Sequence, residues 1–157
     1  MIEFLPDLRF AYEKDIDLLI EGFREAHGES SFKGDFDAEM ARNYISNFIN
    51  MPYSKFRIAV QDNEILGGVM MAASYEWCRQ PLAYVVKFWV FKKGRRTRAA
   101  RLLLDYVNQF AKEYDCSAIY ATATAELDAT EQKLFENLFH RNGFDDVGAT
   151  LRKDCNG

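Results

Sequence analysis

The 157-residue sequence predicts a mixed α/β fold, in which one β-sheet is flanked by about four helices. Segments whose apolar residues alternate or run continuously, as in strands, are interspersed with segments in which they recur every three or four residues, as in helices. The chain is 48% hydrophobic and 28% charged, which is typical of a globular protein. Because this length suits one domain, we expect residues 1–157 to form a single unit.

One strand and two helices are expected in the N-terminal third. A strand over residues 9–12 precedes a helix that starts at Asp15, a common N-cap residue type, and ends near Gly28. A second helix starts near Asp37 and is closed by Pro52. The expected buried faces of these helices are Ile16, Leu19, Ile20 and Phe23, and Ala41, Tyr44, Ile45 and Phe48.

Three strands are expected next. Residues 56–60 alternate and lead through a turn at 61–64 into a strand over 65–75. The pair Gly67–Gly68 indicates a bulge or the close approach of another backbone. Residues 82–91 are apolar on nearly both faces, as in a central strand that is buried on both sides.

The C-terminal part predicts two more helices and two more strands. Residues 99–114 are the clearest helix, and a strand over 118–124 follows. A helix then begins at Asp128 and ends at Gly143, before a last strand over 146–152. The apolar stripes are Leu103, Val107, Phe110 and Tyr114 in the first helix, and Leu134, Phe135, Leu138 and Phe139 in the second. The expected order is βααβββαβαβ.

Positive charge is concentrated in one short segment. Residues 92–101 hold six Lys and Arg and no acid, although the chain has a net charge of −4. The other 14 basic residues face 24 acidic ones, a balance of −10. This distribution indicates a local anion site and argues against a nucleic-acid surface, which spreads its charge along a face. Nucleic-acid binding by the basic loop stays the weaker alternative.

The sequence argues against a disulfide framework, a metal centre and a membrane span. Its three cysteines lie far apart, and its two histidines lack partners at metal-ligand spacing. No apolar stretch reaches the roughly 18 residues of a spanning helix, and no signal-peptide layout is present. We therefore expect a cytoplasmic protein without a metal.

The strand, the basic loop and the following helix form the expected chemical centre. Cations at a helix N-terminus are unfavourable by about 0.3–1 kcal/mol each, because the helix dipole is positive there. Several together favour a multiply charged anion that also accepts hydrogen bonds from the free N–H groups of the first turn.

This segment resembles the pyrophosphate loop of the GNAT acetyltransferase superfamily, Arg/Gln-x-x-Gly-x-Gly/Ala. Residues 95–100 read Arg-Arg-Thr-Arg-Ala-Ala, and Val90 lies five residues earlier, as in the family. Residues 138–144 also resemble the family's Leu-Tyr-x-x-x-Gly-Phe ending. The resemblance covers residues 9–152 and is to small phage and bacterial members with an Arg- and Ala-rich loop.

The resemblance implies an acetyl-CoA-dependent N-acetyltransferase that transfers the acetyl group directly to an amine, with no metal. It implies that the pyrophosphate binds the backbone of residues 96–100 and that the pantetheine arm follows residues 88–90. A backbone N–H near Val90 would polarise the thioester carbonyl. The cofactor-binding residues expected on this basis are Phe88, Val90, Arg95, Arg96, Thr97, Arg98, Ala99, Ala100 and Gln132.

Three positions depart from the family pattern. Arg98 replaces the first loop glycine, and we expect it to reach a phosphate of CoA instead. Gln132 replaces an asparagine, and Phe139 replaces the tyrosine that protonates the leaving thiolate. Arg98 and Phe139 keep open an alternative, a catalytically degenerate CoA-binding or protein-interaction module of the same fold.

An acceptor amine must lose a proton, so a base is expected near the point where strands separate. Tyr84 stands where some family members carry a glutamate, and Glu76 could relay a proton through water. Alternatively, Tyr84 is a core residue and Glu76 a solvated loop acid. The acceptor is a small-molecule or protein amine, and the acidic body favours a cationic one. The resemblance also allows a homodimer.

Overall fold

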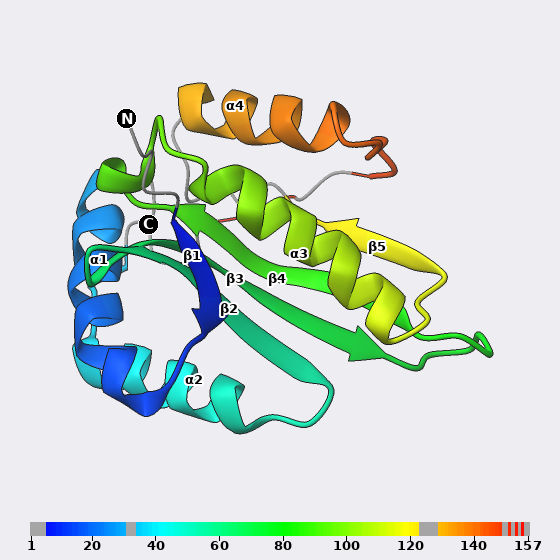
Figure 1. Ribbon diagram of the computed structural model, residues 1–157, viewed down its shortest axis with the longest axis horizontal. Coiled ribbons are helices and arrows are strands. Elements are labelled where there is room, and N and C mark those ends of the chain that lie inside the picture. The colour runs from blue at the N-terminus through cyan, green and yellow to red at the C-terminus, as the bar shows by residue number, and fades with distance from the viewer. Residues whose placement is uncertain are drawn as a thin grey trace.

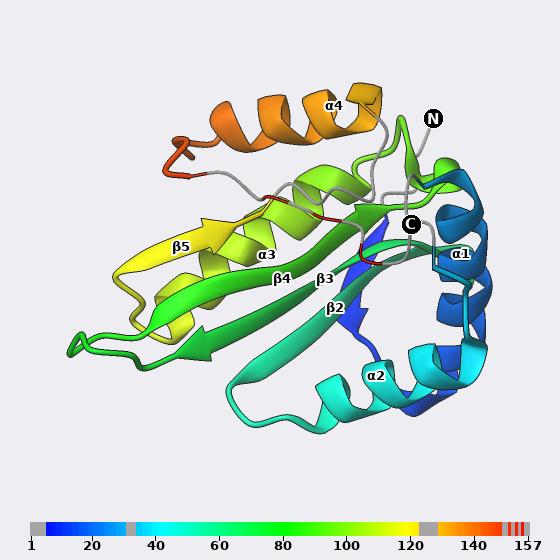
Figure 2. The same cartoon turned by 180° about the vertical axis from the view of Figure 1, so that it is seen from behind.

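The computed structural model describes residues 6–30, 34–122, 129–148, 151, 153 and 155. Its five-stranded sheet has the order β1-β2-β3-β4-β5, with α1 and α2 on one face and α3 and α4 on the other (Figures 1 and 2). The strands are β1 (Asp7–Phe10), β2 (Ser54–Gln61), β3 (Glu64–Ser74), β4 (Leu82–Val90) and β5 (Ala118–Ala121). The α-helices are α1 (Ile16–Glu29), α2 (Ala38–Asn50), α3 (Ala99–Glu113) and α4 (Ala129–His140). Because β1 to β4 pair antiparallel and β5 pairs parallel with β4, the mixed α/β prediction is confirmed.

Some element ends differ from the sequence-based expectation. The first strand lies at Asp7–Phe10 rather than at residues 9–12. The first helix continues through Gly28, so the expected left-handed glycine cap is wrong, and the C-cap is Ser30 in an extended conformation. Of the last expected strand, residues 146–148 and 151 are not in a strand, while 149, 150 and 152 lie outside the described residues. Asp128 and residues 123–124 also lie outside them.

The end of α4 follows the sequence prediction. Gly143 has φ +88, the left-handed conformation that glycine adopts without strain. The N–H of Phe144 donates to the carbonyl of Phe139 at 3.2 Å, and the centroids of their rings are 4.9 Å apart. This turn therefore closes the helix and returns an aromatic side chain to it.

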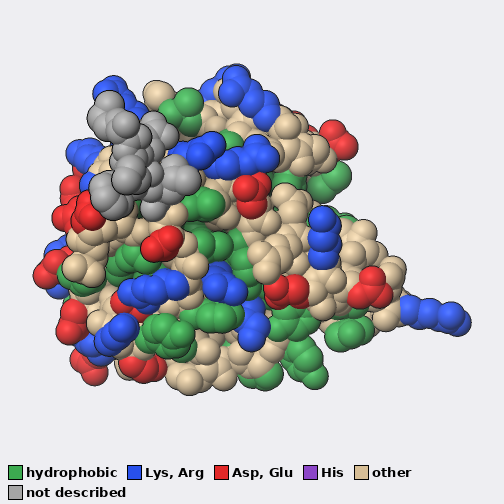
Figure 3. All heavy atoms as spheres, in the orientation of Figure 1, with side chains coloured by type: hydrophobic (Ala, Val, Ile, Leu, Met, Phe, Trp, Pro, Cys, Tyr) green, Lys and Arg blue, Asp and Glu red, His purple; other side chains and the backbone are tan. Residues whose placement is uncertain are grey.

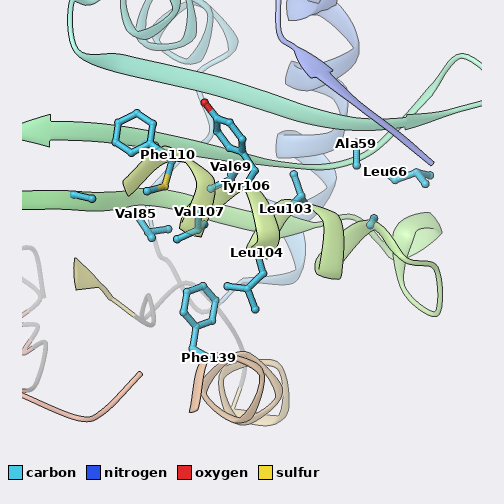
Figure 4. Close-up of a cluster of buried hydrophobic side chains, with 13 residues drawn as sticks. Ala59, Leu66, Val69, Val85, Leu103, Leu104, Tyr106, Val107, Phe110 and Phe139 are labelled. Carbon is cyan, nitrogen blue, oxygen red and sulfur yellow. The ribbon is translucent and has the colours of Figure 1, made fainter. Parts of the chain in front are cut away.

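The main core lies between the sheet and α3 (Figure 4). Leu103, Val107 and Phe110 are buried, as the helical spacing predicts. Two predicted core positions are wrong: Leu134 of α4 is 64% exposed and Tyr44 of α2 is also exposed. In α4 the inward stripe is carried by positions 135, 138 and 139, which leaves position 134 outside it.

The strand β4 is not buried on both sides, contrary to expectation. Ala83 and Val85 are buried, but Val86 is 37% exposed and the other residues of β4 are partly buried. On the sheet face that carries Trp89, the helices α1 and α2 pack on β2 and on the end of β4. The first half of β4 therefore has one face open.

The glycine pair of β3 marks a close approach, as predicted. A Cβ on Gly68 would lie 2.4 Å from the ring of Trp89, and one on Gly67 would lie 2.5 Å from the carbonyl oxygen of Trp89. The β2–β3 register also shifts beside Gly67 and leaves Leu66 as a bulge. Both parts of the prediction are therefore confirmed.

Asp15 directly precedes α1 but does not cap it with its side chain. Its carboxylate oxygens instead accept hydrogen bonds from the Arg9 guanidinium at 2.7 and 2.8 Å, and one also accepts from the N–H of Tyr12 at 2.8 Å. The Asp15 side chain is only 5% exposed. This partly buried ion pair joins β1 to the start of α1.

The Arg9 pair is expected to make the stability of the protein depend on pH. The hydrogen bonds from Arg9 lower the pKa of Asp15 below its ordinary value. As the pH falls, Asp15 therefore takes up its proton in the unfolded chain before it does so in the folded protein. The stability that the ion pair contributes is complete above the ordinary carboxyl pKa and is lost as the pH drops through the lowered pKa of Asp15. Urea unfolding measured between about pH 6 and pH 3 checks this. At pH 6 the Asp15→Asn variant should have a free energy of unfolding about 1–3 kcal/mol lower than the unmodified protein, and this free energy should fall less steeply with decreasing pH. Parallel pH profiles for the two proteins would contradict this.

Candidate functional site

The strand β5 pairs with only the first half of β4. Their last pair is Val85 with Ala121, where β5 ends, whereas β4 continues to Val90 (Figure 2). At the same point β4 carries a bulge, because the register with β3 leaves Val86 unmatched. In the described residues the pairing of β4 with β5 therefore ends at Val85, and we call this point the strand separation.

Beyond this point, the peptide groups of β4 can bind a ligand. The N–H of Phe91 donates to the carbonyl of Leu66 on β3 at 2.8 Å. Because successive peptide groups of a strand point to opposite edges, the N–H groups of Val90 and Phe88 point away from β3. No strand in the described part of the chain pairs with that edge. An extended ligand with amide groups could therefore pair with residues 88–90.

The side chain of Phe88 faces α4. Its ring centroid lies 5.8 Å from that of Phe135 and 5.2 Å from that of Phe139. Phe139 is only 3% exposed and points toward Leu104 of α3 (Figure 4). The position where the GNAT resemblance expects a tyrosine is therefore a core position here.

The loop that follows β4 is folded tightly against β3. Lys92–Gly94 form a turn of 3-10 helix, in which Gly94 is buried. A Cβ on Gly94 would lie 2.3 Å from the carbonyl oxygen of Leu66. Arg96 then takes the left-handed conformation, with φ +68, which turns the chain into α3. Position 98 does not need a glycine, because Arg98 has φ −82.

The start of α3 presents backbone donors. The Thr97 hydroxyl donates to the carbonyl of Gly94 at 2.6 Å and accepts from the N–H of Ala99 at 3.1 Å. Over the described residues, the N–H groups of Arg98, Ala100 and Arg101 have no acceptor. Free N–H groups at the positive end of a helix dipole form an anion site.

The cations of this segment fall into two groups. The paired ones are Lys92 with Glu29, Lys93 with Glu64 at 3.8 Å, Arg95 with Glu131 at 2.5 Å, and Arg101 with Asp105 at 3.0 Å. Arg96 and Arg98 are exposed, and no carboxylate in the described chain pairs with either. Figure 3 shows Lys and Arg side chains gathered over the first part of α3 and the loop before it. Two cations are therefore available to an anion.

Gln132, the expected pantetheine contact, lies in the first turn of α4. Its amide donates to Glu136 Oε1 at 3.0 Å, one turn further along the helix. It lines a groove of about 960 Å³ between β5, α4 and residues 142–148. The residues of the basic loop do not line this groove, so the structure brings Gln132 near the loop only through its neighbour Glu131.

Tyr84 and Glu76, the two expected acid–base residues, lie together. The Tyr84 hydroxyl donates to Glu76 Oε1 at 2.5 Å, and its ring stacks on Tyr120 with a centroid distance of 5.7 Å. The hydrogen bond to Glu76 raises the pKa of Tyr84, which therefore keeps its proton at neutral pH. Glu76 accepts the hydrogen bond of this pair. Tyr84 lies next to the last β4–β5 contact. It is six residues from Val90 along β4, which corresponds to roughly 20 Å at a rise of about 3.3 Å per residue.

No described helix is both long and apolar enough to cross a membrane. In the parts of the chain that the structure describes, no three His, Cys, Asp or Glu side chains are grouped so that they could hold a metal ion.

Three solved structures illustrate the similarity of the fold. A predicted acetyltransferase from Clostridium acetobutylicum, solved with acetyl-CoA, has a TM-score of 0.73 at 20% identity, covering 96% of both chains. An aminoglycoside acetyltransferase from an uncultured soil metagenomic sample has a TM-score of 0.68 at 19% identity, covering 99% of this chain and 100% of the other. A ribosomal-protein-alanine N-acetyltransferase from Brucella melitensis has a TM-score of 0.71 at 14% identity, covering 96% and 99%.

The sequence comparisons give the family. No curated protein sequence matches the chain. Residues 18–140, most of the chain, match the acetyltransferase (GNAT) family. The predicted resemblance is therefore confirmed, and the chain belongs to the GNAT acetyltransferase family.

Proposed function

We propose that the protein is an acetyl-CoA-dependent N-acetyltransferase that transfers the acetyl group directly to an amine. The observation that carries this proposal is the continuity of two binding features. No strand in the described chain pairs with the outer edge of residues 88–90 of β4. This edge runs into the N-terminus of α3, where, among the described residues, N–H groups and two cations, Arg96 and Arg98, have no partner. The Clostridium acetobutylicum neighbour was solved with acetyl-CoA, which supports the same ligand here.

These features match the two halves of CoA. Arg96, Arg98 and the first-turn N–H groups of α3 would hold the phosphates, because guanidinium groups and backbone amides both donate to phosphate oxygens. The N–H groups of Phe88 and Val90 would hold the amide-bearing pantetheine arm. Acetyl-CoA supplies the activated acetyl group when it is bound.

The residues at the strand separation would carry the chemistry. The N–H of Phe88 lies nearer to the separation than that of Val90, so we assign to it the hydrogen bond that stabilises negative charge on the acetyl oxygen. Glu76 would accept the proton of the attacking amine through water, because Tyr84 lies about 13 Å from Phe88 at about 3.3 Å per residue, and Tyr84 orients the carboxylate. No cysteine occupies the positions that match the family's site, so we expect a direct transfer with no covalent enzyme intermediate.

The leaving thiolate takes its proton from solvent. Phe139 offers no hydroxyl and lies in the core, so it cannot take the role of the family's tyrosine. The acceptor is a small-molecule or protein amine, as the names of the aminoglycoside and ribosomal-protein neighbours suggest. A carboxylate at the separation favours a cationic amine.

A thiol-release assay with acetyl-CoA and a panel of amines tests the proposal. We expect turnover with at least one amine, and Glu76→Gln should lower kcat by about 100-fold or more because the base is lost. The dissociation constant of acetyl-CoA should change little in this variant, since Glu76 lies at the far end of β4 from the loop. Binding of acetyl-CoA without thiol release for any amine would favour the catalytically degenerate module.

A further inference from the structure

We infer that Arg95 is a positioning residue that couples the basic loop to α4 through Glu131, so that the site distinguishes whole CoA from its phosphate-bearing half. This inference rests on the proposed function, because it takes CoA as the ligand of the loop. It assigns Arg95 a role different from that of Arg96 and Arg98, although all three lie in the same six-residue motif.

The contact joins two elements that are distant in sequence. Arg95 Nη2 lies 2.5 Å from Glu131 Oε1, across 36 positions of the chain. The Arg95 side chain is 45% exposed and that of Glu131 is 25% exposed, so the pair is partly shielded. In the described chain it is the sole ion pair between the basic loop and α4.

Helix dipoles explain why this pair is favourable. Glu131 lies in the first turn of α4, where the positive end of the dipole stabilises a carboxylate. Arg95 lies just before α3, where the corresponding positive end disfavours a cation. The charge of Arg95 is therefore compensated by Glu131 without any phosphate, unlike the charges of Arg96 and Arg98.

The pair attaches the first turn of α4 to the basic loop. Farther along the helix, Phe135 and Phe139 pack on Phe88 of β4. These contacts hold the middle and end of α4, and Arg95 holds its first turn. A ligand that follows residues 88–90 and also reaches the loop must pass beside α4, whereas a ligand with phosphates alone contacts only the loop.

Two roles for Arg95 predict opposite results for Glu131→Gln. If Arg95 positions α4, loss of the carboxylate removes the attachment, and CoA should bind more weakly. If Arg95 binds phosphate directly, Glu131 competes for it, and the substitution should free Arg95 and strengthen binding. The direction of the change therefore separates the two roles.

Calorimetric titration with CoA and with adenosine 3′-phosphate 5′-diphosphate, which lacks the pantetheine arm, tests the inference. We expect Arg95→Gln and Glu131→Gln each to weaken CoA binding by about 5–10-fold, and the double variant to be no weaker than either single one. Binding of the nucleotide should stay within about twofold, since its contacts are with Arg96 and Arg98. The charge exchange Arg95→Glu with Glu131→Arg should bind CoA more tightly than either Arg95→Glu or Glu131→Arg alone, because it restores the pair.

Lys133→Gln is the matched control, because Lys133 lies on the same turn of α4 and is exposed. Thermal unfolding of each variant verifies that its fold is retained. Equal losses for CoA and the nucleotide in Arg95→Gln, or tighter CoA binding in Glu131→Gln, would overturn the positioning role while leaving the proposed function intact. Failure of the unmodified protein to bind CoA would instead overturn the proposed function, and this inference with it.

Discussion

Replacing both Arg96 and Arg98 with alanine is expected to weaken acetyl-CoA binding by about 100-fold or more. Both side chains are exposed at the start of α3, and no carboxylate in the described chain pairs with either. A hydrogen bond to a charged group contributes about 1.5–3 kcal/mol, and each 1.4 kcal/mol is tenfold in affinity. Isothermal titration calorimetry of the double variant measures the loss.

Arg101→Ala is the matched control for this double variant. Arg101 lies in the first turn of α3, close to both, but its guanidinium is already bound to Asp105 at 3.0 Å. We expect the Arg101→Ala variant to bind acetyl-CoA with an affinity within about threefold of the unmodified protein, because a surface ion pair of this kind contributes little. Affinity should also depend less on salt in the double variant than in the unmodified protein. An unchanged dissociation constant in the double variant would remove the phosphate assignment.

Gly94→Ala is expected to lower the free energy of unfolding by about 3 kcal/mol or more. The added Cβ would lie 2.3 Å from the carbonyl oxygen of Leu66 and 2.9 Å from Cγ1 of Val90. A clash with a backbone carbonyl cannot be relieved by a side-chain rotation. That carbonyl also accepts from the N–H of Phe91 at 2.8 Å, so the start of the basic loop moves and acetyl-CoA affinity falls as well.

Gly28→Ala is expected to have the opposite effect and to raise the free energy of unfolding. Gly28 lies within α1, and no atom lies within 4 Å of the Cβ that alanine would add. Alanine there should stabilise the helix by about 0.5–1 kcal/mol. Urea unfolding of the two variants measures both effects. A Gly94→Ala midpoint equal to that of the unmodified protein would show that β3 and the loop are not packed as described.

Features that depend on local spacing could be predicted from the sequence. The stripe of α3 follows from the 3.6-residue period, and the left-handed Gly143 follows from the need to end a helix. The loop before α3 could be proposed as an anion site because six cations without an acid are unusual at a helix start. The family resemblance supplied its expected ligand.

Features that depend on pairing between distant segments could not be predicted. The bulge at Val86 is set by the register with β3, and it decides that Phe88 faces α4. Which cations of the basic loop are paired depends on acidic residues far along the chain. No spacing rule connects Glu131, for example, to Arg95. Tyr120, which stacks on Tyr84, was missed for the same reason.

Titration of the protein with acetyl-CoA, CoA and ATP tests most directly whether residues 88–90 of β4 and the start of α3 form a CoA site. All three ligands carry phosphates, but ATP lacks the pantetheine arm that residues 88–90 would bind. We expect tight binding of acetyl-CoA and CoA and at least about tenfold weaker binding of ATP. Binding of none of the three, or of all three with equal affinity, would contradict the account and leave the basic loop as a general anion patch.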